Sequence, residues 1–207
     1  MSRASSEHNA MKSLFSKLLR HWKLTIALAL ALGIFSVSVG VSGAYVLAHT
    51  STEKFCVGCH EMSYNFAEYK GTIHDTNRTG VRAICTDCHV HHEPAELILD
   101  KIKATKDLYY TYISPSIDTK EKFEAKRAVM AQKVWREMKA NDSHHCRSCH
   151  REDKMNLELQ TAKAKSRHAK AKVEGKTCIE CHFAIAHKEP EGPGPAELFA
   201  EAAAKAQ

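Results

Sequence analysis

The sequence predicts a mostly α-helical protein, with a single N-terminal transmembrane helix followed by a small domain of helices and loops. Three observations support this fold class. Residues 24–48 contain no Asp, Glu, Lys or Arg. Two later segments, residues 93–113 and 118–141, carry apolar side chains at helical spacing. The sustained period-two alternation that marks a half-buried strand is absent from the chain.

The segment 24–48 is long enough to cross a bilayer. At roughly 1.5 Å per residue it reaches about 37 Å as a helix, against a hydrocarbon core of about 30 Å. Four cations precede it, and no acidic residue lies among them: Lys12, Lys17, Arg20 and Lys23. The positive-inside rule then keeps residues 1–23 in the cytoplasm as a short tail and exports the rest. Cleavage as a signal peptide is the alternative, although the apolar region of a signal peptide is usually shorter.

The exported domain is expected over residues 49–187, and a flexible C-terminal tail over residues 188–207, which begin with a Pro/Gly-rich linker. The expected inner faces of the two long helices comprise Leu97, Ile98, Ile102, Leu108, Tyr109 and Tyr112 in the first, and Phe123, Val134, Trp135 and Met138 in the second. These apolar residues are few for a domain of this size. Something other than side chains is therefore expected to fill its interior.

All eight cysteines belong to one repeated motif, C-x-x-C-H. The four copies are Cys56–Cys59–His60, Cys85–Cys88–His89, Cys146–Cys149–His150 and Cys178–Cys181–His182. The motif is the attachment signature of c-type haem, in which both thiols bond to the porphyrin and the histidine is an axial ligand of the iron. The sequence therefore predicts four covalently bound c-type haems, which would pack the interior of a multihaem cytochrome c domain.

Two other interpretations of the cysteines are weaker. Zinc also binds C-x-x-C pairs, but it does not require a histidine directly after the second cysteine in every pair. Disulfides within the pairs would suit a thioredoxin-like βαβ context, which the sequence lacks.

Each iron needs a second axial ligand. Apart from the motif histidines and the cytoplasmic His8 and His21, eight histidines are available: His49, His74, His91, His92, His144, His145, His168 and His187. His91 and His92 are too close to His89 to reach another iron easily. His144 and His145 crowd the third motif. A histidine on the protein surface is otherwise simply solvated.

Two further sequence features, the net charge and the small residues of the apolar segment, concern the binding partners of the protein. The formal net charge is +6, and haem propionates would offset it, so the basic balance is no argument for nucleic acid. Small residues in the second half of the apolar segment would let another helix approach closely, as in a homo-oligomer: Ser36, Ser38, Gly40 and Gly43. Ordinary tolerance of Gly and Ser in membrane helices explains them equally well.

The chain resembles the NapC/NirT/NrfH family of membrane-anchored tetrahaem quinol dehydrogenases. The resemblance rests on the anchor, the four motifs, and the stretches FCVGCHEM, GVRAICTDCHV, KATKDLY, KANDSHHCRSCH and KTCIECHFAIAH. The sequence departs from the family at HVHHEP, where relatives often have Pro after HV. The tail after Pro190 is not covered.

The resemblance implies the iron ligands. Met62 matches a methionine that binds the first haem iron in place of the adjacent histidine, with ligation by His60 as the alternative. Second ligands for the other three haems would come from His74, His168 and His187. The expected pairing gives His74 to the fourth haem, His187 to the third and His168 to the second.

The resemblance also implies a quinol site near the first haem, with Lys101 and Asp107 matching its basic and acidic residues. Asp107 would accept a quinol proton, and Lys101 would orient the hydroxyl group. From the residues alone, an ordinary surface ion pair between Lys103 and Asp107 is favoured instead.

The implied protein is a quinol dehydrogenase of the bacterial inner membrane, single-pass, with its haem domain in the periplasm. It would oxidise menaquinol or ubiquinol in anaerobic respiration and pass electrons to a periplasmic reductase or a soluble cytochrome. The alternative is an electron-transfer cytochrome without its own quinol site, supplied by another membrane protein. The residues do not indicate which reductase it serves.

Overall fold

The computed structural model describes residues 2–205, apart from the side chains of residues 2–10 and 18–19. The chain divides into two compact units, of which the first ends at His49 and the second begins at Thr50. Throughout residues 2–205 the regular structure is helical and no strand occurs. The predicted mostly α-helical fold class is therefore confirmed.

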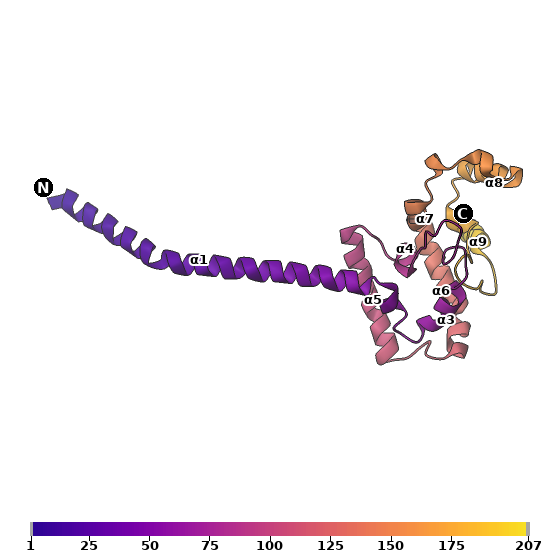
Figure 1. Cartoon of the computed structure of the whole chain (residues 1–207), viewed down its shortest axis with the longest axis horizontal. Coiled ribbons are helices and arrows are strands. Elements are labelled where there is room, and N and C mark those ends of the chain that lie inside the picture. Colours follow the sequence, from indigo (N-terminus) through magenta and orange to yellow (C-terminus); the bar gives the residue numbers. More distant parts are fainter. Residues whose placement is uncertain (1, 206–207) are drawn as a thin grey trace. The chain divides into compact units, whose positions relative to one another are not determined.

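Helix α1 (Ser2–Thr50) forms the first unit (Figure 1). From Met11 to Thr50 it is long and apolar enough to cross a membrane. Most of its described apolar side chains are exposed, and Ile34 and Phe35 expose 68% and 67% of their surface. A helix that is apolar all round and not covered by protein is suited to a lipid environment. It has the length and composition of the predicted anchor.

The second unit is a series of mostly short helices joined by loops (Figure 1). Its helices, in chain order, are α2 (Glu53–Cys56), α3 (Met62–Tyr69), α4 (Cys85–His89), α5 (Pro94–Tyr112), α6 (Lys120–Ala140), α7 (His144–Cys149), the 3-10 helices η1 (Glu152–Lys154) and η2 (Leu157–Leu159), α8 (Ala162–Val173), the 3-10 helix η3 (Cys178–Glu180), and α9 (Pro195–Lys205).

Local sequence signals set the starts of the longer helices. Pro94 occupies the first turn of α5, where its fixed φ is compatible with a helix and its missing N–H is not needed. Thr119 and Thr161 cap α6 and α8, because each side-chain oxygen accepts a hydrogen bond from a backbone N–H in the first turn, at 3.3 and 3.2 Å.

A tight turn after α6 brings the third and fourth motifs together. Asp142 and Ser143 have φ angles of 54° and 53°, so both adopt the left-handed region in which Asp is tolerated better than most residues. Ser143 is fully buried and does not cap α7. Its Oγ instead accepts a hydrogen bond from the backbone N–H of Ile179 at 3.2 Å. The turn therefore fixes α7 against η3.

Few apolar side chains are buried in the second unit. Within the described residues, the buried hydrophobic side chains are Tyr69, Phe123, Trp135 and Ile179. Phe123 and Trp135 were expected on the inner face of α6, where Val134 and Met138 are half-buried. So small a core agrees with an interior that haem groups fill in part.

The expectation that α5 has a buried inner face is wrong. No residue of α5 is buried, and Ile98, Ile102 and Tyr112 expose 46%, 61% and 74% of their surface. Helical spacing shows which side chains share a face, but it does not show what covers that face. The described residues of the second unit leave most apolar side chains of α5 exposed, and Leu97 is half-buried.

The C-terminal segment, expected to be a flexible tail, contains a helix. Residues 195–205 form α9, which packs against η3, and Pro195 is buried. Lys139 of α6 lies over the ring of Phe199, with its Nζ 4.4 Å from the ring centre. Proline at the first turn and the Ala-rich sequence that follows it both favour a helix. The last two residues, 206 and 207, lie outside the described part.

Candidate haem-binding sites

Each C-x-x-C-H motif lies on or beside a short helix. The first begins at the end of α2, the second is α4 itself, the third occupies α7, and the fourth begins with η3. In all four motifs, the cysteines are free thiols rather than disulfides. A helical turn places the two cysteines of C-x-x-C on one side of the backbone. This is the arrangement needed to bond both thiols to one porphyrin edge.

The four motifs follow one another in space in their chain order. The thiols of Cys56 and Cys85 are hydrogen-bonded, so the first and second motifs touch, and α4 packs against α2. The second motif in turn packs against the third, α4 against α7, as Figure 1 shows. Cys146 of the third motif interacts electrostatically with Cys178 of the fourth. The motifs therefore form a continuous series.

The thiols differ in acidity before any haem is attached. The hydrogen bond from Cys85 is the largest cause that lowers the pKa of Cys56 to about 7. Burial, reinforced by the neighbouring Cys146, raises the pKa of Cys88 to about 11. Because thioether formation needs nucleophilic sulfur, the thiol of Cys56 is the more reactive of the two at neutral pH.

Three motif histidines each face one distal histidine. The ring centres of His74 and His150 lie 6.2 Å apart and those of His89 and His187 also lie 6.2 Å apart. Those of His168 and His182 lie 5.9 Å apart. Two imidazoles that bind one metal from opposite sides have centres about 6 Å apart, since each metal–nitrogen bond is about 2 Å. All three distances match this value.

The histidine rings that face one another differ from the expected pairing. His74 faces the histidine of the third motif, whereas the fourth was expected. His187 faces the histidine of the second motif, whereas the third was expected. His168 faces the histidine of the fourth motif, whereas the second was expected. The segments that carry these residues are far apart in sequence, and chain folding decides which of them meet. The three distal histidines expected from the resemblance are nevertheless the ones that meet motif histidines.

The surroundings of two distal histidines fit a bound iron. Nδ1 of His74 is buried without a hydrogen-bond partner, so its ring lies in a space that the protein's own polar groups do not complete. Nδ1 of His168 is bonded to Oε1 of Gln160 at 2.9 Å, which orients the ring and leaves Nε2 free. Free sulfur pairs beside facing imidazoles are the donor set of a c-type haem.

The position of His187 is set by an ion-pair cluster. Arg127 is buried on α6, and its guanidinium donates to the carboxylate of Glu68 on α3 at 2.9 and 2.5 Å. Glu68 also accepts a hydrogen bond from the backbone N–H of Lys188 at 2.9 Å. Since Lys188 follows His187 directly, the cluster fixes the loop that presents His187 to His89.

The first motif is different. The ring of His60 is largely exposed, its Nε2 is 3.0 Å from the carbonyl oxygen of Asp118, and its Nδ1 is 3.4 Å from Glu61. Among the side chains that the structure describes, no second histidine ring faces it. Met62 is half-buried at the start of α3. His60 is thus directed toward polar protein groups.

Lys101 lies beside the first motif. Its Nζ donates to the carbonyl oxygen of Thr50 at 2.7 Å. Burial lowers the pKa of Lys101, and the nearby Cys56 opposes that shift. The amine is therefore close to the sulfur that would hold the first haem.

The structure does not bring Asp107 to Lys101 by any contact within the described residues. Asp107 instead interacts electrostatically with Lys133 of α6. The surface ion pair between Lys103 and Asp107 is not formed either, because Lys103 pairs with Asp100 at 3.5 Å.

Sequence analysis missed Asp100 and considered the histidines around it only as candidate iron ligands. Oδ2 of Asp100 accepts hydrogen bonds from the backbone N–H and Nδ1 of His91, at 3.0 and 2.7 Å. The rings of His91 and His145 lie 4.6 Å apart, and His144 is 3.0 Å from Glu93. These histidines contact one another and carboxylates. The departure HVHHEP was the sequence signal for this cluster.

The anchor helix, the series of C-x-x-C-H motifs and the facing histidines define a membrane-anchored multihaem c-type cytochrome. The comparison with known proteins agrees. The sequence profile of the NapC/NirT cytochrome c family, N-terminal region, matches residues 19–192. The chain belongs to this family, whose members are membrane-anchored electron-transfer cytochromes with covalently bound haem c.

Several curated relatives are similar over most of the chain. It is 45% identical to the cytochrome c-type protein TorY of Escherichia coli O157:H7, over 76% of this chain and 44% of the relative. It is 47% identical to the denitrification system component NirT of Stutzerimonas stutzeri, over 70% of this chain and 73% of the relative. It is 41% identical to the cytochrome c-type protein NapC of Escherichia coli K12, over 86% of this chain and 92% of the relative.

The chain spans less than half of the length of the TorY proteins that it matches. No solved structure matches it at a significant level.

Proposed function

We propose that the protein is a tetrahaem quinol dehydrogenase, anchored in the inner membrane with its haem domain in the periplasm. The observation that carries the proposal is the asymmetry among the motifs. Three motif histidines face a second imidazole, whereas His60 is bonded to Asp118. One haem of four would then have a different ligand set and an open face for a lipid-soluble reductant. Haem c, when bound, supplies one-electron transfer at its iron.

The proposed ligands follow from the facing rings. His89 and His187 would hold the second iron, His150 and His74 the third, and His182 and His168 the fourth. The first iron would take Met62, with His60 as the alternative.

Helix α5 provides a surface suited to quinol. It carries Lys101, which lies beside Cys56, and it exposes the apolar side chains of Ile98, Ile102 and Leu108. A quinol has a polar head group and an apolar tail, so both features of α5 match it. Lys101 would donate a hydrogen bond from Nζ to a quinol oxygen.

Asp107 is the proposed proton acceptor. It lies on α5 near these apolar side chains, and its carboxylate makes no hydrogen bond within the described part of the chain. Asp100 is less suited to the role. Burial alone would raise the pKa of Asp100, but the hydrogen bonds from His91 outweigh burial and lower it. A carboxylate with a lowered pKa is a weaker base.

The test is reduction of the haem-loaded protein by menaquinol and by ubiquinol, followed by stopped-flow absorbance. Asp107→Asn is expected to slow quinol-driven reduction at least 100-fold and to leave haem content and reduction by dithionite unchanged. Glu96→Gln, on the same helix, is the matched control. An unchanged rate of quinol-driven reduction in Asp107→Asn would remove Asp107 from the mechanism. If only Asp100→Asn slows that reduction, Asp100 is the proton acceptor instead.

A cytochrome without its own quinol site is the second candidate. The separation of Asp107 from Lys101 favours it, because the two residues expected to share one head group make no contact. In that case neither quinol reduces the protein directly, and electrons come from another membrane protein. In either case the electron acceptor would be a periplasmic reductase or a soluble cytochrome.

A further inference from the structure

Residues 11–23 have the pattern of a basic amphipathic helix. With about 100° between successive residues, Met11, Leu14, Phe15 and Trp22 fall within an arc of about 100°. The cations lie on the remaining surface: Lys12, Lys17, Arg20 and Lys23. No acidic residue occurs between Glu7 and Glu53. This separation of apolar and cationic faces is typical of helices that lie in a membrane interface.

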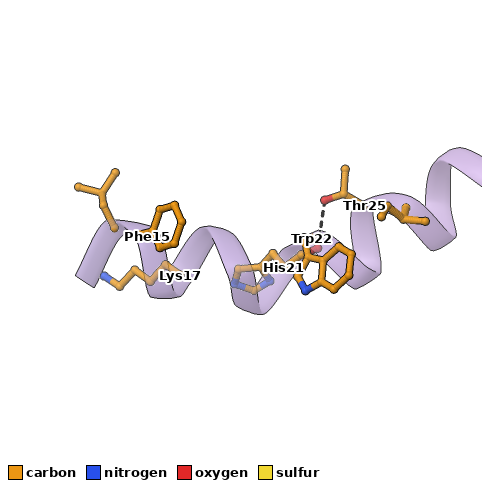
Figure 2. A pocket seen from close by; sticks show the side chains of 7 residues that line it. Phe15, Lys17, His21, Trp22 and Thr25 are labelled. Atoms are coloured by element: carbon orange, nitrogen blue, oxygen red, sulfur yellow. Dashed lines mark hydrogen bonds between the residues drawn. The ribbon is translucent and has the colours of Figure 1, made fainter. Parts of the chain in front are cut away.

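The described side chains on the apolar face of this segment are exposed. Met11, Leu14 and Phe15 expose 67%, 69% and 64% of their surface, and Trp22 exposes 49%. Figure 2 shows the side chains on α1 that line a mostly apolar hollow at this point, Phe15 and Trp22 among them. Lys17 and His21 border the same hollow. An apolar surface with a cationic border is complementary to acyl chains beneath anionic head groups.

The length of α1 makes a straight arrangement unfavourable. Residues 24–48 alone span the hydrocarbon core, so a straight helix would carry residue 15 about 13 Å beyond it, at roughly 1.5 Å per residue. The head-group layer is only about 5 to 8 Å deep on each side. Phe15 and Leu14 would then lie in water.

A local feature allows α1 to bend between the two segments. Oγ1 of Thr25 donates to the carbonyl oxygen of His21 at 3.1 Å, drawn as the dashed line in Figure 2. Such bonds from Ser or Thr to the carbonyl four residues earlier often bend helices. Figure 1 shows that α1 curves in its N-terminal part.

We propose that residues 11–23 form an interfacial anchor, which bends away from the transmembrane segment near Thr25 and lies on the cytoplasmic leaflet, where its cations bind anionic lipid head groups. The choice of leaflet rests on the proposed orientation. The inference does not depend on quinol oxidation, and its failure would leave that proposal intact.

The experiment uses the full-length haem-loaded protein in lipid nanodiscs. In one variant, Phe15→Trp with Trp22→Phe, the introduced tryptophan reports from the apolar face, and the signal of Trp135 is subtracted with Trp22→Phe alone. In its matched control, Ser16→Trp with Trp22→Phe, the reporter is one residue further, about 100° around the helix. Quenching is measured with acyl-brominated phospholipid and with aqueous acrylamide, in discs of phosphatidylcholine alone and of phosphatidylcholine mixed with phosphatidylglycerol.

In the anionic discs, brominated lipid is expected to quench the reporter at position 15 and acrylamide the reporter at position 16. The variant Lys12→Gln/Lys17→Gln/Arg20→Gln should weaken docking about fivefold per charge removed. Removal of three cations from α8, in Lys163→Gln/Lys165→Gln/Arg167→Gln, should leave docking unchanged.

Three results would overturn the proposal. Acrylamide quenching at both positions would mean that the segment projects into water. Protection of position 15 from both quenchers would mean that protein, such as a second copy of the chain, covers the apolar face. Equal lipid quenching in both disc types, unaffected by the triple variant, would mean that anionic head groups are not recognised.

Discussion

Arg127 and Glu68 form a bidentate ion pair that joins α6 to α3, with guanidinium–carboxylate distances of 2.9 and 2.5 Å. The side chain of Arg127 is only 8% exposed, and Glu124 is a second carboxylate partner at 2.6 Å. Through Lys188, the pair also holds the loop that presents His187. A single cluster of charges thereby links the packing of two helices to the geometry of one pair of facing histidines.

Replacement of Arg127 by Gln is expected to lower the free energy of unfolding by about 2 kcal/mol, because Glu68 would be left partly buried without its charged partner. Thermal unfolding of the haem-loaded protein measures the change. Arg136→Gln is the matched control, since Arg136 lies on the same helix, is exposed, and bonds to the uncharged Gln132 at 3.3 Å. Equal destabilisation by both substitutions would mean that the Arg127–Glu68 pair contributes nothing specific.

The pH dependence of stability follows from the same carboxylate. Burial would raise the pKa of Glu68, but the hydrogen bonds from Arg127 and from the backbone of Lys188 outweigh burial and lower it. A carboxyl group whose pKa is lower in the folded state stabilises the fold above its unfolded pKa, and this contribution is lost as the pH falls through the folded value.

Stability should therefore decline as the pH falls below about 4.3, the ordinary pKa of Glu. Denaturant unfolding at a series of pH values measures this decline, and Glu68→Gln should make it shallower. An equally steep decline in Glu68→Gln would assign the acid sensitivity to other carboxylates.

The sequence was sufficient for much of the site, because the chemistry of c-type haem fixes residue types at a local spacing. The C-x-x-C-H motifs could be found directly, and the resemblance identified His74, His168 and His187, the three distal histidines that meet motif histidines. Their pairing could not be predicted, since it depends on how segments far apart in the chain fold together.

The same limit explains the other differences. Periodicity identified the apolar face of α5 but not that it stays uncovered. The composition of the tail did not show that Phe199 packs against Lys139. Helical spacing could not establish whether Lys101 and Asp107 share a ligand, because their partners, Thr50 and Lys133, come from segments far from α5 in the chain.

The facing of His168 and His182 predicts which haem responds to a change at position 168. His168→Met would replace one imidazole by a thioether, and Met/His ligation raises the reduction potential of a c-type haem. A redox titration followed by absorbance and EPR should therefore show one low-spin haem shifted to higher potential. His144→Met is the control, because His144 bonds to Glu93 at 3.0 Å and should leave all potentials unchanged.

The affected haem is identified with a second variant, Cys178→Ala/Cys181→Ala, which removes the fourth attachment site. The EPR signal shifted by His168→Met should be the one that this variant lacks. If the shifted signal instead belongs to the second motif, the pairing expected from the resemblance is restored and the facing of His168 and His182 is not a ligand pair.

The bond between His60 and Asp118 leads to the prediction on which the proposed function depends most. If His60 is engaged by the Asp118 carbonyl, the first iron takes Met62 from the protein, and loss of the thioether must change that haem alone. Met62→Leu is expected to abolish the near-infrared magnetic circular dichroism of methionine ligation and to prevent rapid quinol-driven reduction. Met62→His should restore an axial protein ligand to that haem and give it a lower potential, since imidazole favours the oxidised iron relative to thioether. Met155→Leu, at a methionine that is 38% exposed and outside every motif, is the matched control. A first haem whose spectrum and potential are the same in Met62→Leu and in the unmodified protein would be ligated by His60, and the asymmetry among the four motifs would then no longer support an open face for quinol.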